Sequence, residues 1–467
     1  MKPSLRSPAS FALLVCLLGQ AVPSATQAAE VPPNIVVFLA DDLGYGDLHC
    51  YGNKVIQTPN LDAFASQGVK FTQGYSACAV CSPSRSAILT GRAPLRNGVV
   101  NWIAEGREMH LRVQENSIAK LLKTQGYATC HVGKWHLNGK FNSPEQPQPN
   151  DHGFEWWMAT QNNAAPSHQN PKNFIRNGEA VGPMTGYSAP LVAQEAVTWL
   201  KEKRDTSKPF YLQVWTHEPH LPIESDPKFM ALYPDLEPEV RQHHGNVSQM
   251  DAAFGVLMAA LDELKLRDNT LVLFTSDNGP EGRGDNARTR GATGGLRGRK
   301  RDVYEGGVRV PFLVRWPGKT PIGVTHDTPV IGSDIFHTAC MAAGVTPPAD
   351  RPYDGVSLLP LFRSELLVRP KPLFFHCAIA PGSYKFGMRV GDFKILANRA
   401  LDRFELYDLK NDPQEQADLS AKEPARFNEL KKQISELVVE METESPNWSA
   451  DKDDFAVPKK KAGAEGK

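Results

Sequence analysis

Two apolar segments lie far apart in the chain, and both end in acidic residues at the same point of a strand pattern. The sequence NIVVFLADD ends in Asp41 and Asp42, and the sequence TLVLFTSDNG carries Asp277 and Asn278 shortly after its apolar run. Continuous apolar and β-branched runs are typical of parallel strands that are buried on both faces. The two segments therefore predict an α/β domain built around a parallel sheet.

The polar residues at these two strand ends predict a metal site. Ligands of open α/β sheets bind outside the carboxyl ends of the strands, so the two exits can lie side by side. Together they supply three carboxylates and one amide oxygen. An all-oxygen set suits Ca²⁺ or Mg²⁺ better than zinc, and Ca²⁺ tolerates less regular geometry. The alternative is that each pair caps a following helix or turn, but two such pairs favour the metal.

Two further strand candidates end in ionisable groups. The segment YATCHVGKWHL carries Lys134 and His136, and the segment FYLQVWTHEPH carries His217 and His220. A single histidine is more often structural, but these follow strand candidates directly and share the expected ligand edge. Helical segments such as SIAKLLKTQG and DAAFGVLMAALDELKL lie between the strands. This alternation predicts a doubly wound sheet with helices on both faces.

A long segment, GRGDNARTRGATGGLRGRKRDVYEGGVRVP, is rich in glycine and arginine and carries Lys300 near its centre. One interpretation is a mobile, solvated loop. The other is a cationic rim that brings one or two residues to an anionic substrate. Over the whole chain, 52 Lys and Arg residues balance 52 Asp and Glu residues. Selectivity for an anion must therefore be local, and no nucleic acid partner is expected.

The N-terminus has the pattern of a signal peptide. Lys2 and Arg6 precede the apolar run FALLVCLLG and the small residues of SATQAAE, and the run is well short of the roughly 20 residues that span a membrane. We expect residues 1–29 to be removed and the protein to be exported, with no stable membrane insertion. The compartment is periplasmic, secreted or lysosomal in type, depending on the host. The remaining cysteines reveal no disulfide framework, and at least one stays unpaired.

The segment CSPSRSAILTGR resembles the Cys-x-Pro-x-Arg signature of the type I, formylglycine-dependent sulfatases, which belong to the alkaline phosphatase superfamily. Here the signature residues are Cys81, Pro83 and Arg85. The motifs ADD, GKWHL, THEPH, SDNG and LRGRKRDVYEGGVRVP follow in the family's order, and within it the chain is most similar to arylsulfatases and N-acetylgalactosamine-6-sulfatases. The resemblance implies an alkaline-phosphatase-like fold, with a large, mixed but mainly parallel sheet flanked by helices.

The resemblance also explains why a thiol lies among residues suited to hard oxygen chemistry. It implies that a formylglycine-generating, or sulfatase-maturating, enzyme oxidises Cys81 to Cα-formylglycine before folding is complete. The aldehyde hydrates to a diol, which is a hard oxygen nucleophile. The implied metal ligands are Asp41, Asp42, the converted Cys81, Asp277 and Asn278, and the implied ion is Ca²⁺, with Mg²⁺ as the alternative.

The implied catalytic residues are Cys81, Arg85, Lys134, His136, His217 and Lys300. In the family's mechanism, Arg85 and Lys134 would stabilise the diol, one hydroxyl of which attacks sulfur. His217 and Lys300 would protonate or stabilise the leaving oxygen. His136 would remove the proton of the second hydroxyl, which expels sulfate and restores the aldehyde. His220 is left to substrate recognition or to a turn.

The residue pattern of the sequence changes after residue 368. The break RSELLVRPKP predicts a domain boundary there, followed by short strand candidates in PLFFHCA, KFGMRVGDFKILA and RFELYDL and by a charged helix. We expect a catalytic domain over residues 30–368, an α+β subdomain with an antiparallel sheet over 369–450, and a charged, disordered tail over 451–467. The second part resembles the small C-terminal subdomain of sulfatases.

The substrate is the least constrained feature. Trp102, Trp156, Trp157 and His376 can line a sugar pocket or pack in the core, and a sulfated glycan or sulfated small molecule is the expected substrate of an exported sulfatase. Two alternatives stay open. A phosphomonoesterase or phosphodiesterase of the same superfamily would need a second metal site and a Ser or Thr nucleophile. A glycan-binding homologue without catalysis would keep Cys81 unconverted.

Overall fold

The computed structural model describes residues 31–282 and 291–448. The chain divides into the units Met1–Val31 and Pro32–Lys467, and the fold belongs to the second. The expected signal peptide and the expected tail over 451–467 lie outside the described residues. No helix within the described ranges combines the length and the hydropathy that a membrane span requires.

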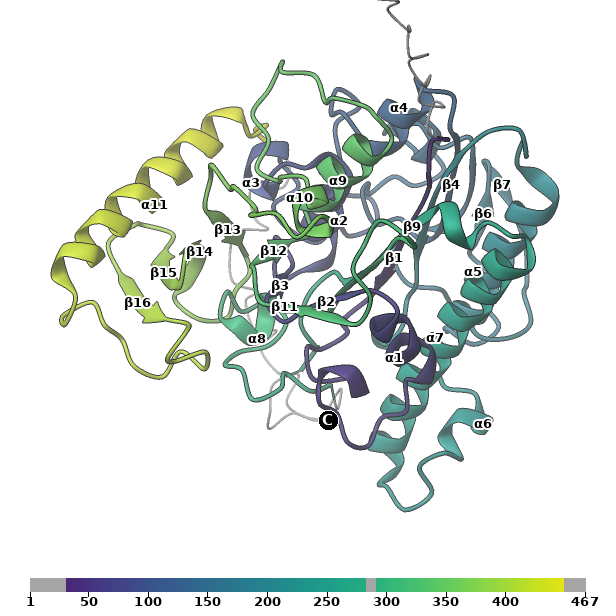
Figure 1. Cartoon of the computed structure of the whole chain (residues 1–467), viewed down its shortest axis with the longest axis horizontal. Helices are drawn as coiled ribbons and strands as arrows, with labels where there is room; N and C mark the ends of the chain where they lie inside the picture. The colour runs from purple at the N-terminus through teal and green to yellow at the C-terminus, as the bar shows by residue number, and fades with distance from the viewer. Residues whose placement is uncertain (1–30, 283–290, 449–467) are drawn as a thin grey trace, which may run out of the picture. The chain divides into compact units, whose positions relative to one another are not determined.

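A mixed sheet forms the centre of this unit (Figure 1). Within the described residues it has ten strands in the order β11-β2-β10-β9-β1-β8-β4-β5-β6-β7. The strands are β1 (Asn34–Ala40), β2 (Val69–Phe71), β4 (Ala128–Lys134), β5 (Trp156–Thr160), β6 (Ile175–Arg176), β7 (Glu179–Ala180), β8 (Phe210–Trp215), β9 (Thr270–Ser276), β10 (Phe312–Arg315) and β11 (Val324–His326). The central neighbours β9, β1, β8, β4 and β5 are parallel, and β10 and β6 pair antiparallel with this group.

The apolar runs seen in the sequence form the buried middle of the sheet. Every residue of β1, β8 and β9 is buried. Side chains alternate along β1: Ile35 and Val37 belong to one apolar core with residues of α2, α4 and α9. Val36 and Phe38 belong to a second core with residues of α1, α5 and α7. Helices therefore cover both faces of the sheet (Figure 1), and the predicted doubly wound α/β fold is confirmed.

The α-helices of the described residues are α1 (Pro59–Ser66), α2 (Cys81–Thr90), α3 (Pro94–Asn97), α4 (Ile118–Lys123), α5 (Ser188–Thr198), α6 (Pro227–Met230), α7 (Pro238–Glu263), α8 (Glu305–Val308), α9 (Asp334–Ala342), α10 (Leu359–Phe362) and α11 (Pro424–Glu444). A π-helical turn continues α5, and short 3-10 turns lie at His49–Tyr51, Pro149–His152 and Arg267–Asn269. The helix expected from residue 251 onward begins instead at Pro238.

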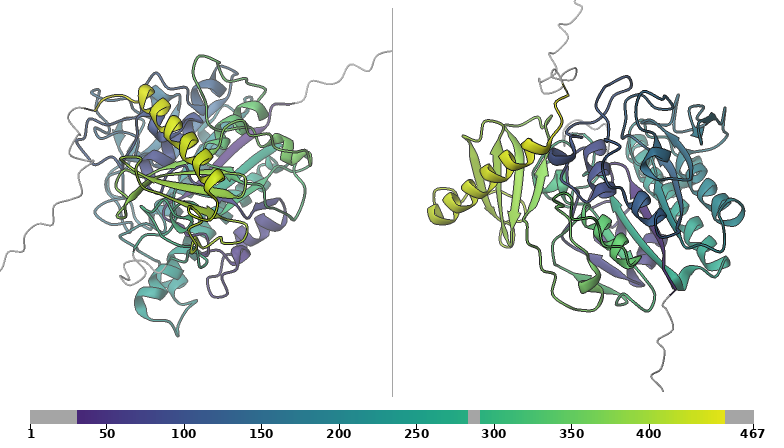
Figure 2. Two further views of the ribbon diagram at one scale, coloured as in Figure 1. Left: turned by 90° about the vertical axis from the view of Figure 1, so that its left-hand side faces the viewer. Right: turned by 90° about the horizontal axis from the view of Figure 1, so that it is seen from above.

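A second, four-stranded sheet follows in the chain. Its strands are β13 (Leu373–His376), β14 (Tyr384–Val390), β15 (Phe393–Asn398) and β16 (Phe404–Asp408), and each pairs antiparallel with the next. Helix α11 lies across one face of this sheet (Figure 2) and buries Leu430, Ile434 and Val438. A small pair, β3 (Gly74–Tyr75) and β12 (Val330–Ile331), forms a two-stranded sheet of its own. The antiparallel C-terminal sheet is confirmed, while the boundary at residue 368 stays a prediction.

Candidate active site

The polar strand ends meet at one edge of the central sheet. The register of β1 on β9 pairs Ala40 with Ser276, so the residues that follow the two strands lie opposite each other. The Asp42 backbone N–H donates to Oδ1 of Asp277 over 3.1 Å. Nδ2 of Asn278 donates to Oδ1 of Asp42 over 2.6 Å. The two segments are more than 200 residues apart in sequence, yet they form one cluster of buried oxygens.

Cys81 is the first residue of α2 and lies beside this cluster. All ten residues of α2 are buried, and Oγ of Ser82 accepts a hydrogen bond from the Ile103 N–H, which ties the start of the helix to the following loop. Burial raises the pKa of the Cys81 thiol, because the nearby charges of Lys134 and Lys300 do not offset the loss of solvation. A thiol in this state is protonated at neutral pH and is a poor nucleophile.

Two buried cations, Arg85 and Lys134, pair with the carboxylates of Asp277 and Asp41. The Arg85 guanidinium donates to Oδ2 of Asp277 through Nη2, over 2.7 Å, and through Nε, over 3.0 Å. Nζ of Lys134 lies 2.6 Å from Oδ2 of Asp41. Arg85 also stacks on the ring of Trp215, 5.2 Å from its centroid. The signature arginine is thus held in one orientation by a carboxylate and by an aromatic face.

A third buried cation, Lys300, comes from the glycine- and arginine-rich segment. Its Nζ lies 2.8 Å from Asp42 and 3.2 Å from Oε2 of Glu281. Burial lowers the pKa of Lys300, but Asp42 and the other negative charges nearby together outweigh this effect, and the net shift is upward. Glu281 is not among the site residues predicted from the sequence. An acid three residues past Asn278, in the same strand exit, was the available signal.

The carboxylates of the cluster differ in protonation. Burial raises the pKa of Asp41, but Lys134 and its neighbours outweigh burial and hold that pKa well below its usual value. Burial and the neighbouring Asp41 carboxylate raise the pKa of Asp277 to about 7, against the opposing effect of Arg85. Carboxylates this close repel each other, so Asp277 is partly protonated at neutral pH. A divalent cation would relieve that repulsion.

Two histidines lie near the cluster, and hydrogen bonds define the tautomer of each. Nε2 of His136 lies 3.0 Å from the Ile103 carbonyl, which can only accept, so Nε2 carries the proton. Thr160 donates its hydroxyl proton to the Asn162 carbonyl, so Oγ1 of Thr160 accepts from Nε2 of His217. Nδ1 of both His136 and His217 is buried and has no hydrogen-bond partner among the described residues. Each ring therefore keeps one nitrogen free to accept a proton.

Two further histidines, His220 and His168, also lie near this cluster. Nδ1 of His220 contacts the Leu221 carbonyl, and its Nε2 lies 3.7 Å from Oδ2 of Asp42. One ligand atom each from Asp41, Asp42 and His220 falls within 4.8 Å of the others. The ring of His168 lies 5.5 Å from that of His217. His220 had a signal, its place in the motif THEPH, whereas nothing local in sequence pointed to His168.

The residues at these strand ends fit a hard cation. Oδ1 of Asp41 and Oδ1 of Asn278 are buried and accept no hydrogen bond from any described residue. Buried oxygens are rarely left without a partner, because their desolvation is costly. The two atoms come from the two strand exits that supply the predicted ligands. An oxygen-binding ion such as Ca²⁺ or Mg²⁺ is the ligand that this donor set suits.

The aromatic residues considered for a sugar pocket separate into two groups. Trp157 is buried in the core, and Nε1 of Trp156 donates to Glu195 over 3.2 Å. These two rings are packing residues. Trp102 is 43% exposed, and His376 is buried at the wall of a cavity.

The six cysteines of the described residues are all free thiols.

Comparisons with known proteins define the class. The sulfatase family model matches residues 33–345, and a model of the C-terminal region of N-sulphoglucosamine sulphohydrolase matches residues 298–444. The chain therefore belongs to the sulfatase family. It is a sulfuric ester hydrolase, and the resemblance found in the sequence is confirmed.

Individual relatives agree with this assignment. N-acetylgalactosamine-6-sulfatase of Canis lupus familiaris is 35% identical over 391 residues, which cover 76% of this chain and 72% of the relative. Arylsulfatase A of Homo sapiens is 34% identical over 406 residues and covers 79% of this chain and 76% of its own length. The crystal structure of Ps i-CgsB in complex with k-i-k-neocarrahexaose superimposes with a TM-score of 0.78 at 28% identity and covers 87% of this chain and 93% of that chain.

Proposed function

We propose that this sulfatase hydrolyses sulfate esters of carbohydrates and uses a formylglycine formed from Cys81 beside a divalent cation. The observation that carries the proposal is the chemistry around Cys81. Its thiol is buried and its pKa is raised, so it is unsuited to attack as a cysteine, yet buried cations and carboxylates converge on it. Conversion to an oxygen nucleophile would remove this mismatch.

The proposed formylglycine and cation would each supply one chemical function. When formed, Cα-formylglycine provides a hydrated aldehyde as the oxygen nucleophile, and when bound, Ca²⁺ or Mg²⁺ provides Lewis-acid stabilisation. Asp41, Asp42, Asp277 and Asn278 would hold the ion, together with residue 81. With that ion as partner to the carboxylates, Lys134 and Lys300 could bind the oxygens of the sulfate group. Three cations on one sulfate would stabilise the charge that develops in the transition state.

The two histidines with bare nitrogens suit proton transfer. Burial and the charge of Lys134 lower the pKa of His136 well below its usual value. The ring is therefore neutral, and its Nδ1 is available to accept a proton. Burial and the neighbouring His168 likewise lower the pKa of His217. His217 would therefore take up a proton only when an anion binds beside it, and it would then deliver that proton to the leaving oxygen.

The substrate class follows from the relatives. One relative is an N-acetylgalactosamine-6-sulfatase, and one structural neighbour was solved with k-i-k-neocarrahexaose. We propose a sulfated glycan or its oligosaccharides as the natural substrate, in the exported compartment that the N-terminus suggests. The partner in maturation would be a formylglycine-generating enzyme. A screen of sulfated monosaccharides and oligosaccharides would identify the sugar and the sulfate position.

The experiment that tests the reaction compares 4-nitrophenyl sulfate with 4-nitrophenyl phosphate. We expect turnover of the sulfate, inhibition by a chelator and recovery with Ca²⁺. Cys81→Ala should lose at least about 10³-fold in kcat, because it removes the nucleophile. Faster turnover of the phosphate would favour the phosphatase alternative.

Peptide mass spectrometry across residue 81 tests the conversion separately. Active enzyme should contain formylglycine, which differs in mass from cysteine. Active enzyme with thiol alone at this position would contradict the proposed nucleophile. Thiol alone in protein without activity, purified from its native host, would favour a glycan-binding role.

A further inference from the structure

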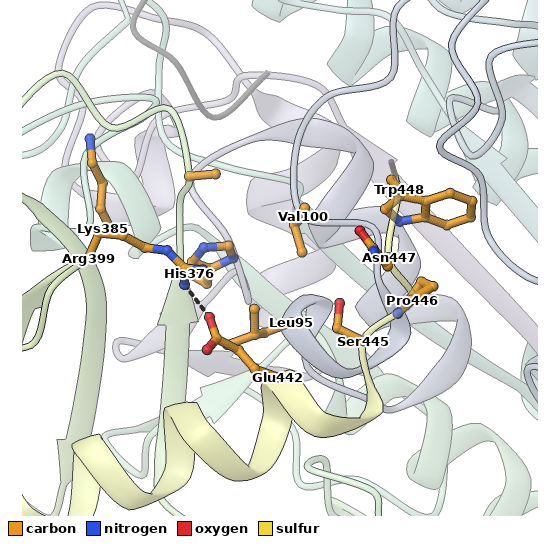
Figure 3. Close-up of a pocket in the computed structure, with 11 residues that line it drawn as sticks. Leu95, Val100, His376, Lys385, Arg399, Glu442, Ser445, Pro446, Asn447 and Trp448 are labelled. Carbon is orange, nitrogen blue, oxygen red and sulfur yellow. Dashed lines mark hydrogen bonds and ion pairs between the residues drawn. The ribbon is translucent and has the colours of Figure 1, made fainter. Parts of the chain in front are cut away.

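A cavity of about 340 Å³ lies between the C-terminal sheet, the end of α11 and the loop after α3. Figure 3 shows Lys385, Arg399 and His376 on one side of it and the segment 445–448 on the other. Two of these residues are cations, one is a buried imidazole, and the opposite wall carries the Trp448 ring. The catalytic residues do not line this cavity. Its size and its mixture of polar groups with an aromatic ring suit one sugar unit.

The cationic side of the cavity is suited to an acidic group. Arg399 pairs with Glu442 (Figure 3), and this carboxylate is the acid that lines the cavity beside the two cations. His376 is 2% exposed, and its Nδ1 has no hydrogen-bond partner among the described residues. Burial, with Arg399 and Lys385 nearby, lowers the pKa of His376 to about 3, so the ring is neutral. The cavity therefore carries a net positive charge.

The opposite wall is held in place before any ligand binds. Nε1 of Trp448 donates to the Gly98 carbonyl over 2.8 Å, and the Trp448 ring packs on His110 with centroids 5.0 Å apart. A Cβ on Gly98 would lie 2.2 Å from Cδ of Pro446, and its φ is +86°, so this contact requires glycine. A rigid aromatic wall lowers the entropy cost of binding a sugar.

The cavity is connected to the catalytic residues by one short loop. Val100 lines the cavity, while Ile103 donates to Ser82 and contacts His136. Only two residues therefore separate Val100, in the cavity wall, from the residue that contacts Ser82 and His136. His376 also directly precedes Cys377, which packs in the same apolar cluster as Cys81. A sugar unit bound here would be a neighbour of the unit that carries the scissile sulfate.

We propose that this cavity is a subsite for an acidic sugar unit next to the sulfated one, and that Arg399 and Lys385 bind its carboxylate or its second sulfate. The inference rests on the proposed function and adds the charge of the neighbouring unit. Binding replaces the Arg399–Glu442 pair with a pair between Arg399 and the substrate. Simple aryl sulfates do not reach the cavity.

The test uses kcat/KM for three kinds of substrate: 4-nitrophenyl sulfate, sulfated monosaccharides, and disaccharides in which the neighbouring unit carries a carboxylate, a second sulfate or no charge. We expect an acidic disaccharide to be the best substrate. Arg399→Gln and Lys385→Gln should each lower its kcat/KM by about tenfold through KM. Both variants should keep wild-type turnover of 4-nitrophenyl sulfate, which also shows that they fold. The carboxylate and sulfate arms identify which group binds.

Two more variants test the direction of the effect and provide a control. Glu442→Gln frees Arg399 and should lower KM for the acidic disaccharide only. Arg363→Gln is the matched control, because Arg363 and Arg399 are 58% and 59% exposed and each pairs with one glutamate. The proposal is overturned if no acidic disaccharide exceeds its uncharged counterpart and the sulfated monosaccharide, or if Arg399→Gln behaves like Arg363→Gln. No turnover of any sulfate ester by the wild type would instead refute the proposed function, and the subsite with it.

Discussion

The two histidines that we propose for proton transfer are each fixed by a single hydrogen bond. Each ring uses one nitrogen for a fixed neighbour, which is the Ile103 carbonyl for His136 and the Thr160 hydroxyl for His217. The other nitrogen stays bare and buried. A group that is neutral until an anion arrives can serve as a base, or as an acid once the anion has raised its pKa.

His217 should matter most for substrates with a poor leaving group. His217→Ala is expected to lower kcat/KM for a sugar sulfate by about 10²-fold to 10⁴-fold, because a sugar alkoxide needs a proton to depart. The loss with 4-nitrophenyl sulfate should be much smaller, since its phenolate leaves without one. Steady-state kinetics of the two substrates measure the difference. His49→Gln, an exposed histidine elsewhere, is the control, and equal losses on both substrates would argue against an acid role.

A histidine away from the active site makes folding sensitive to acid. Burial lowers the pKa of His152 to about 3, compared with about 6.5 in an unfolded chain. Below pH 6.5 the unfolded state takes up a proton that the folded state does not, so stability falls as the pH drops from about 6.5 toward about 3. In His152→Gln, the loss of unfolding free energy between pH 7 and 5.5 should be about 1 kcal/mol smaller than in the wild type. Urea unfolding at both pH values measures it, and equal pH dependence in the two proteins would contradict the assignment.

At the level of elements, helix α1 is capped by a residue from another helix. Asp251 lies in the middle of α7, and its carboxylate accepts hydrogen bonds from the backbone N–H groups of Asn60 and Leu61 over 3.1 and 2.8 Å. Thr58, the residue before α1, makes no side-chain cap. The helical segment DAAFGVLMAALDELKL, predicted from the sequence, starts at Asp251, but α7 extends back to Pro238. The acid stabilises a neighbouring helix instead.

Removal of this cap should destabilise the protein without touching the active site. Asp251→Ala leaves the first N–H groups of α1 without an acceptor, and we expect a loss of about 1–3 kcal/mol in unfolding free energy. Asp262→Ala is the matched control. Asp262 lies on the same helix, but it is half exposed, and its ion pair with Nη1 of Arg267 is long, at 3.5 Å. The urea midpoint measures both variants. Similar midpoints would show that the cap contributes little.

At the scale of the whole molecule, buried ion pairs join the C-terminal sheet to the catalytic part. Nζ of Lys394, on β15, lies 2.9 Å from Glu305 of α8 and 2.9 Å from Glu415. Glu305 also accepts a hydrogen bond from the Tyr75 hydroxyl of β3 over 2.7 Å. Burial raises the pKa of Glu415 to about 7, although Lys394 opposes this. One ammonium thus compensates two carboxylates that have no access to water.

Lys394→Met should therefore be among the most destabilising substitutions in the C-terminal part. It leaves the buried Glu415 without its cation and Glu305 with only the longer pair to Arg309, at 3.4 Å, and we expect a loss of about 3–5 kcal/mol. The triple variant with Glu305→Gln and Glu415→Gln should recover part of this loss, because it also removes the buried charges. Urea unfolding followed by fluorescence measures the series. A single variant within about 1 kcal/mol of the wild type would show that the pairs are not coupled to folding.

The sequence predicted features that depend on neighbouring residues. The parallel strands are continuous apolar runs, and the four-stranded sheet and α11 follow the turn and helix signals of the C-terminal region. The polar residues at the strand ends could be assigned to one edge of the sheet, because all parallel strands of a doubly wound fold present their carboxyl ends there. These features follow from local periodicity and from the rules of chain topology.

Other features arise only when distant segments pack together. Arg85 and Asp277 pair although they are 192 positions apart. The hydrogen-bond partners of Asp251 lie on another helix. Glu281 and His168 lie in loops, whose sequences have no regular period. The cavity that we propose as a subsite likewise combines β14, β15 and the end of α11 with the loop after α3. By itself the sequence determined the order of the elements and the chemistry at the strand ends, because backbone periodicity is local. Only the tertiary structure decided which charges pair and which cavity forms, since those depend on side-chain distances that no local pattern encodes.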